Sequence, residues 1–146
     1  MTRKTGSCLC GAVRVSAEIG PRKIAACHCG QCRTWTGGGP YFSTSVVDPV
    51  IEGEGHIGIY VASEWGERGF CKTCGTTLFW KMKGRPVHNL AAGLFDDQSD
   101  LAVTEEIFCD RRAEWQAPFP GAKQSTEAQE QALLADYFAA QKGDQP

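Results

Sequence analysis

The chain has 146 residues, of which 42% are hydrophobic and 22% are charged, a balance typical of soluble globular proteins that excludes a disordered or fibrous chain. Its length predicts a single domain. Fifteen basic and seventeen acidic side chains give a net charge of -2 without a basic cluster, which argues against nucleic-acid binding, since such binding depends on neutralising phosphates. No apolar run is long enough to span a membrane and residues 1–8 lack the apolar core of an export signal, so we expect a cytoplasmic protein without a membrane partner.

The first three quarters of the chain are rich in strand signals. Residues 12–19 alternate apolar and polar side chains, the pattern of a strand with one buried face. Three further runs, 57–62, 76–81 and 101–108, are rich in β-forming residues, and glycine and proline punctuate the gaps between them. The sequence therefore predicts a mostly β domain.

A helical pattern appears only near the end of the chain, at Glu127–Gln141, where apolar residues can share one broad face. Thr126 followed by Gln129 is typical of a capping box at the start of a helix. A stretch containing several prolines and glycines precedes it. We therefore expect a main domain over residues 1–116, with a linker and C-terminal helix at 117–146 packed on it or appended to it.

Eight cysteines are the unusual feature of the composition. They fall below the roughly 8–10% that marks a disulfide scaffold, and without an export signal they are expected to stay reduced. Seven of them form three short motifs: Cys8 with Cys10, then Cys27 with Cys29 and Cys32, then Cys71 with Cys74. Reduced thiols grouped in this way are typical of metal ligands.

The seven motif cysteines can be divided between metal sites in two ways. In the first, Cys8, Cys10, Cys71 and Cys74 form a closed site of the kind that holds structural zinc, and Cys27, Cys29 and Cys32 form a site with an open fourth position, as in catalytic zinc sites. In the second, Cys29 and Cys32 pair with Cys71 and Cys74 as a zinc ribbon, and the remaining three cysteines form the open set. Spacing alone favours the first without excluding the second.

Three residues near these motifs have more than one interpretation. Cys109 could complete the open site, although we expect a small hydrophobic residue within a strand at 107–109. His28 lies between two candidate ligands, and its ring is expected to point away from the metal. Arg33, directly after Cys32, is either a surface arginine or a cation that offsets the charge of the site.

The motifs resemble a known family, the glutathione-dependent formaldehyde-activating enzymes, which share a domain with centromere protein V. The resemblance runs from Gly6-Ser7-Cys8-Leu9-Cys10-Gly11 through the motif at 27–37 and Arg68–Gly75 to Trp115, about three quarters of the chain. It implies small antiparallel sheets held by a structural zinc on Cys8, Cys10, Cys71 and Cys74, and a catalytic zinc on Cys27, Cys29 and Cys32. The helix after Thr126 lies outside it.

The resemblance also implies a reaction, the condensation of formaldehyde with glutathione to S-(hydroxymethyl)glutathione, which is a carbon-sulfur lyase reaction run in reverse. We therefore expect an enzyme that binds two zinc ions per chain and a small-molecule thiol, glutathione in the family example. One alternative is a non-catalytic zinc module that binds glutathione or a protein partner. Another is a redox sensor in which Cys27, Cys29 and Cys32 release zinc and form a disulfide.

Overall fold

The computed structural model describes residues 1–143 and is mostly β, as the sequence predicts. It contains two compact units, each formed by two segments of the chain. The first unit consists of Met1–Ala25 and Phe42–Val103, and the second consists of Ala26–Tyr41 and the chain from Thr104 onward. Within the described residues, no helix is long and apolar enough to cross a membrane. Residues 144–146, the end of the predicted linker and helix segment, lie outside the described residues.

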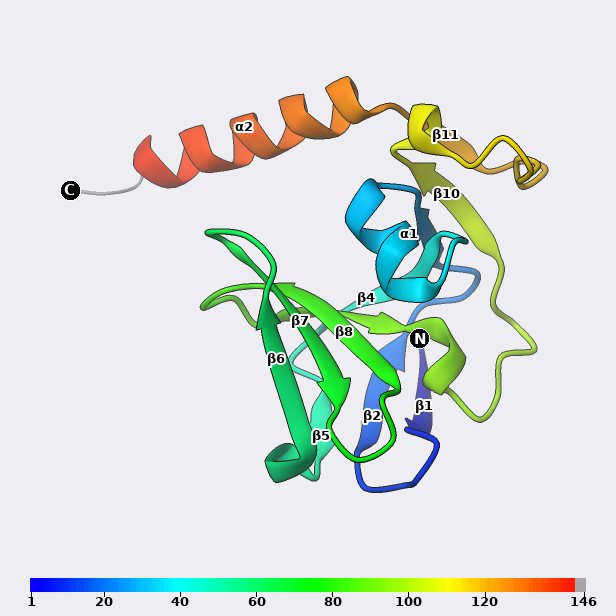
Figure 1. Ribbon diagram of the computed structural model, residues 1–146, viewed down its shortest axis with the longest axis vertical. Coiled ribbons are helices and arrows are strands. Elements are labelled where there is room, and N and C mark those ends of the chain that lie inside the picture. Colours follow the sequence, from blue (N-terminus) through cyan, green and yellow to red (C-terminus); the bar gives the residue numbers. More distant parts are fainter. Residues whose placement is uncertain (144–146) are drawn as a thin grey trace. The chain divides into compact units, whose positions relative to one another are not determined.

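In the first unit, three antiparallel strands form a small sheet in the order β1-β2-β5, drawn in blue and cyan in Figure 1. These strands are β1 (Thr2–Ser7), β2 (Arg14–Ile19) and β5 (Val50–Glu52). The predicted alternation is confirmed in β2, where Val15, Ala17 and Ile19 are buried and the residues between them are more accessible. One face of this sheet therefore belongs to the core.

A second series of antiparallel strands in the first unit has the order β4-β9-β8-β7-β6. The strands are β4 (Tyr41–Val47), β6 (Ile57–Val61), β7 (Gly66–Cys71), β8 (Thr77–Met82) and β9 (Val87–Ala91). The predicted strands at 57–62 and 76–81 are confirmed as β6 and β8. The sequence did not identify β7, which pairs with both of its neighbours.

Glycine allows β7 to pack closely against the aromatic side chains of β8. A Cβ atom at Gly69 would lie 2.5 Å from the phenyl ring of Phe79, closer than any real contact. The register of β7 and β8 shifts between Gly69 and Phe70. Gly69 is thus needed for the approach of a neighbouring ring.

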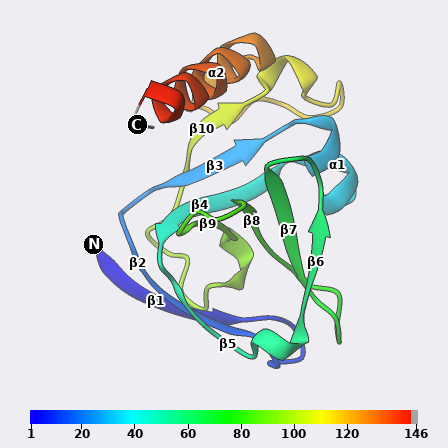
Figure 2. The ribbon, with the colours of Figure 1, turned by 90° about the vertical axis from the view of Figure 1, so that its left-hand side faces the viewer.

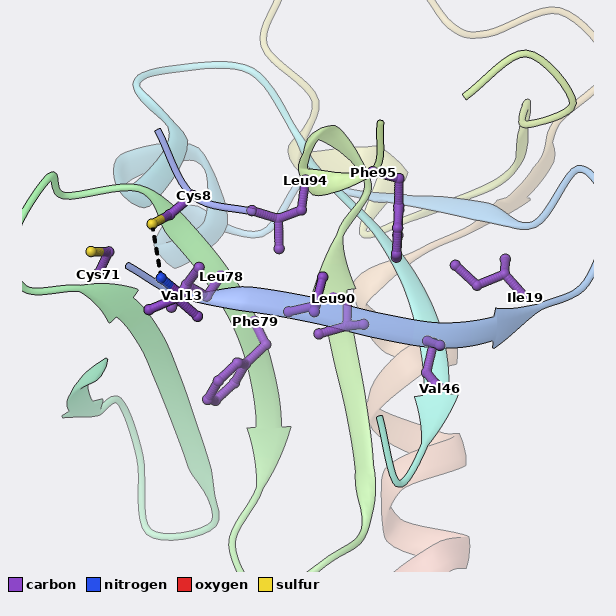
Figure 3. Packing of buried hydrophobic residues seen from close by; sticks show 12 residues of the cluster. Cys8, Val13, Ile19, Val46, Cys71, Leu78, Phe79, Leu90, Leu94 and Phe95 are labelled. Atoms are coloured by element: carbon purple, nitrogen blue, oxygen red, sulfur yellow. Dashed lines mark hydrogen bonds between the residues drawn. The ribbon is translucent and has the colours of Figure 1, made fainter. Parts of the chain in front are cut away.

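The core of the first unit joins the two sets of strands. Its most buried large side chains are Ile19, Leu78, Leu90 and Phe95, and none of them is more than 2% exposed. Figure 3 shows Cys8 and Cys71 beside Val13 at one end of this cluster. Two of the candidate metal ligands are therefore continuous with the hydrophobic core.

The second unit carries both helices. Strand β10 (Val103–Ile107) lies between β11 (Lys123–Ser125) and β3 (Ile24–Cys27). Its pairing with β11 is parallel, and Figure 2 shows it beside β3. The predicted strand at 101–108 is confirmed as β10. Helix α1 (Gly30–Thr36), which the sequence did not indicate, directly follows Cys29.

The predicted C-terminal helix is confirmed as α2 (Glu127–Gly143), and its capping box forms as expected. The Thr126 amide donates to Gln129 Oε1 (2.8 Å), and the Gln129 amide donates to Thr126 Oγ1 (3.2 Å). The first turn is also tied to the 3-10 turn η3 (Cys109–Arg111), because Arg111 donates two hydrogen bonds to the Glu127 carboxylate. Local signals at the helix start are therefore reinforced by tertiary contacts.

Candidate metal centres

Four cysteine sulfurs of the first unit converge on one point. Cys8, Cys10, Cys71 and Cys74 have sulfur atoms that all lie within 4.8 Å of one another. The sulfurs of Cys8 and Cys10 are 3.6 Å apart, and those of Cys10 and Cys71 are 3.8 Å apart. In a tetrahedral site with zinc–sulfur bonds of about 2.3 Å, sulfur atoms are separated by about 3.8 Å. This four-cysteine cluster therefore fits a zinc ion in both ligand type and spacing.

Two tight turns bring these sulfurs together. In the first, the Gly11 amide donates to the Cys8 carbonyl (3.1 Å), and in the second the Gly75 amide donates to the Cys71 carbonyl (2.8 Å). Gly11 and Gly75 both have φ of +78°, a conformation that favours glycine. Cys8 and Cys10 therefore meet through a turn, as do Cys71 and Cys74.

Backbone and hydroxyl groups of the first unit contact the sulfurs of this cluster. Hydrogen bonds from the Thr76 hydroxyl and backbone lower the pKa of Cys74 to about 5. A backbone hydrogen bond from Ala12 lowers the pKa of Cys10, but burial and the neighbouring cysteines outweigh it and raise the value to about 11. Burial acts to raise the pKa of Cys8, and hydrogen bonds from the Val13 amide and from Cys10 bring it below its ordinary value. The protein thus supplies donors that stabilise thiolates here.

The second unit holds a cluster of three cysteine sulfurs. Cys27 ends β3, Cys29 is the N-cap of α1 and Cys32 lies in the first turn of that helix. The three sulfurs lie within 4.8 Å of one another. The helix itself brings Cys32 back toward Cys29, since the Cys32 amide donates to the Cys29 sulfur (3.3 Å). We call this group the three-cysteine cluster.

The surroundings of Cys27 favour the protonated form of its thiol. Hydrogen bonds to the sulfurs of Cys29 and Cys32, followed by burial, raise its pKa above the ordinary value. Metal binding by cysteine requires the thiolate. A metal ion bound by the three-cysteine cluster would therefore have to displace the Cys27 proton.

The sulfurs of the described residues gather in the four-plus-three grouping that the sequence favoured. Cys109 belongs to neither group within residues 1–143. The expectation that it lies within a strand is wrong, because β10 ends at Ile107 and Cys109 begins the 3-10 turn η3, where it is half-buried. All eight cysteines are free thiols.

Arg33 lies on α1, directly after Cys32, and two backbone carbonyls from outside this helix hold its side chain. Its Nε donates to the Gly38 carbonyl and its Nη1 to the Arg111 carbonyl, both at 3.3 Å. Trp115, which is 70% exposed, lies over Gly38, where a Cβ atom would be 3.5 Å from the indole ring. Arg33 is therefore oriented by the loops that surround its helix.

The sequence did not identify the residue that pairs with His28. His28 is 1% exposed, and its Nε2 lies 2.8 Å from Oε1 of Glu106, which is fully buried. Glu106 is one of two adjacent glutamates in β10, and neither belongs to a recognisable motif. Only the pairing of distant segments could reveal this contact. The other two histidines also have partners: His56 is hydrogen-bonded to Thr73, and His88 to the Pro86 carbonyl.

Comparison with known proteins identifies the family. The model of the glutathione-dependent formaldehyde-activating enzymes matches residues 3–111. The chain belongs to this family. Among its relatives is an uncharacterized lyase of Schizosaccharomyces pombe, 32% identical over 112 residues that cover 75% of this chain and 81% of the relative.

Two further proteins are similar to this chain. A protein of Halomonas elongata named "Putative glutathione-dependent formaldehyde-activating enzyme" is 31% identical over 122 residues, covering 75% of this chain and 77% of that protein. A crystal structure of a Rhodobacter sphaeroides protein has a TM-score of 0.54 and 19% identity, and covers 84% of this chain and 99% of that one. This last similarity supports the fold alone.

Proposed function

We propose that the protein is a zinc-dependent enzyme of the carbon-sulfur lyase type that acts on thiol adducts. Its first candidate reaction is the combination of glutathione with formaldehyde. Family membership and the names of the two relatives support the class of reaction and of substrate. The observation that carries the proposal is the unequal size of the two cysteine clusters, four sulfurs in one and three in the other.

The unequal clusters suit different tasks. Four cysteines complete a tetrahedral structural zinc site, whereas three leave one position for an exogenous ligand. A zinc ion bound by Cys27, Cys29 and Cys32 would favour the thiolate form of a thiol that reaches it. In the proposed reaction the thiol loses its proton, a carbon-sulfur bond forms and the carbonyl oxygen of formaldehyde gains a proton. The reverse reaction breaks the same carbon-sulfur bond.

Charge assigns a role to Arg33 in this proposal. A divalent ion with three thiolates has a formal charge of -1, because 2 - 3 = -1, and a fourth thiolate would make it -2. Arg33 directly follows Cys32 in the sequence, and hydrogen bonds to two backbone carbonyls set the orientation of its guanidinium group. We propose that this positive charge offsets the added negative charge and supports substrate binding.

The ligands also point to a compartment. Both clusters need reduced cysteines, and thiols are kept reduced in the cytosol but not in oxidising compartments. We therefore propose that the protein works in the cytoplasm with two zinc ions per chain. Elemental analysis of protein purified under reducing conditions should give two zinc ions per chain.

The reaction is tested against its uncatalysed background, because glutathione and formaldehyde also combine unaided. Exchange between free and glutathione-bound formaldehyde is followed by NMR, with and without the protein. We expect wild-type protein to accelerate exchange, Cys29→Ala to lose the acceleration and one zinc ion, and Arg33→Gln to weaken it at low glutathione concentration. Cys109→Ala is the matched control, because Cys109 belongs to neither cluster in the described chain, and it should retain full activity.

The result also separates the enzyme from the alternative functions. A protein with two zinc ions that leaves exchange at its background rate would contradict catalysis and favour the non-catalytic zinc module. Loss of the second zinc ion with formation of a disulfide under mild oxidant would favour the redox sensor.

A further inference from the structure

His28 lies between Cys27 and Cys29 in the sequence, and two contacts fix its position. Its backbone amide donates to the carbonyl of Ile107 (3.0 Å), and its ring Nε2 lies 2.8 Å from Glu106 Oε1. Both partners are adjacent residues of β10. One backbone bond and one side-chain bond therefore hold the residue between Cys27 and Cys29 against the same strand.

Glu106 is the centre of a buried polar network in the second unit. Its Oε1 accepts from His28 and lies 3.3 Å from Nη2 of Arg112, and its Oε2 accepts from the Phe119 amide (2.9 Å) and from Gln124 Nε2 (2.7 Å). No buried side-chain nitrogen or oxygen in residues 1–143 lacks a partner. The network is thus fully satisfied, the condition in which buried polar groups make a structure rigid.

The groups that donate to Glu106 favour its ionised carboxylate form. Burial acts to raise the pKa of Glu106, but hydrogen bonds from Gln124, Phe119 and His28 and the charge of Arg112 outweigh it and lower the pKa below its ordinary value. A carboxylate only accepts hydrogen bonds. His28 therefore donates to this carboxylate through its Nε2–H, and this bond fixes the orientation of the ring.

This anchor matters because the three sulfurs lie within 4.8 Å of one another, although bringing three thiolates together is opposed by their mutual repulsion. In known metal sites, partners outside the ligands orient them, and losing such a partner typically lowers metal affinity about 10–100-fold. Here the anchored residue is the one between two of the cysteines.

We infer that His28 and Glu106 form a positioning pair that holds Cys27 and Cys29 in the metal-binding arrangement. Neither residue touches the ion or substrate. The inference rests on the proposed function in one respect, that the three-cysteine cluster binds zinc. A pair that served only the folding of the second unit would instead leave the zinc affinity of the folded protein unchanged.

The test compares three histidine variants. His28→Phe keeps a ring but removes the donor to Glu106, His28→Gln restores an N–H donor of similar reach, and His88→Phe is the matched control in the first unit. The zinc affinity of each cluster is measured by competition with a chromophoric chelator, and cobalt substitution reports thiolate coordination spectroscopically. Thermal unfolding of the metal-free protein measures folding separately.

We expect His28→Phe to weaken zinc binding at the three-cysteine cluster about 10–100-fold, while the affinity of the four-cysteine cluster stays unchanged. The cobalt-thiolate charge-transfer band of the weakened site should decrease at the same time. His28→Gln should recover most of the affinity, and His88→Phe should resemble wild type. Should His28→Phe fail to fold, Glu106→Met, which keeps a side chain of similar length but removes the oxygen that accepts from His28, decides the question through the same loss of affinity.

The possible results are distinguishable. If wild-type protein binds two zinc ions and the folded His28 or Glu106 variants bind both as tightly, the positioning pair is wrong and the proposed function stands. Equal weakening of both clusters would also overturn the pair, because it would show a general effect on the fold. A wild-type protein that binds only one ion would overturn the proposed function and this inference together.

Discussion

Replacing Glu106 with leucine should destabilise the second unit strongly. Glu106 is fully buried and accepts hydrogen bonds from four groups. Arg112 and Gln124 are partly accessible and can turn toward water, but His28 is 1% exposed and would keep an unpaired ring N–H. An unsatisfied buried donor costs about 1–3 kcal/mol, and removing one partner of a buried ion pair costs about 3–5 kcal/mol. We therefore expect a loss of about 3 kcal/mol at pH 7.

The loss should depend on pH in a defined direction. The pKa of Glu106 is lower in the folded protein than its ordinary value of 4.5, so its contribution is fully present above about pH 4.5. The contribution disappears as the pH falls through the folded-state pKa. The difference between wild type and Glu106→Leu should therefore be constant near neutrality and shrink in acid.

Urea unfolding at several pH values measures this difference, with hydrogen exchange of the β10 amides as a probe specific to the second unit. The matched control is Glu105→Leu, because Glu105 is the exposed neighbour on the same strand, and it should change stability by less than about 0.5 kcal/mol. A Glu106→Leu loss below about 1 kcal/mol, or one equal in acid and at neutrality, would refute the reasoning.

Three further predictions concern the first unit and the two clusters. Cys71→Ala should unfold the first unit, whereas Cys29→Ala should remove one zinc ion and leave the fold intact, as judged by metal analysis and circular dichroism; collapse of Cys29→Ala would reverse the assignment. Gly69→Ala should lower the melting temperature, because the new Cβ would overlap a phenyl ring at 2.5 Å, and Gly93→Ala, with nothing within 4 Å, is its control. Burial lowers the pKa of His88 below 6.5, despite an opposing hydrogen bond that His88 donates to the Pro86 carbonyl. Stability should therefore fall as the pH drops below 6.5 toward the folded-state pKa, and His88→Phe should flatten this slope in thermal unfolding.

Features with a local cause could be predicted from the sequence. The strand at Arg14–Ile19 follows from alternation over successive residues, and α2 follows from its capping box, both of which involve contacts within a few positions. The cysteine motifs belong to the same class, because two thiols separated by one or two residues can converge through a single turn. Strand β7, by contrast, contains two glycines and two charged residues, Glu67 and Arg68, and becomes a strand only through pairing with β6 and β8.

The amino-acid sequence by itself determined the family, the mostly β character, the late helix and the identity of the seven clustered cysteines, because each depends on residue type and short spacing. Only the tertiary structure decided that the sulfurs gather as four and three, that Cys109 stands apart from both groups in the described chain, and that Glu106 anchors His28. These contacts join residues up to 78 positions apart. A buried carboxylate and an exposed one are identical as letters, and their difference arises only when distant strands pair and exclude water.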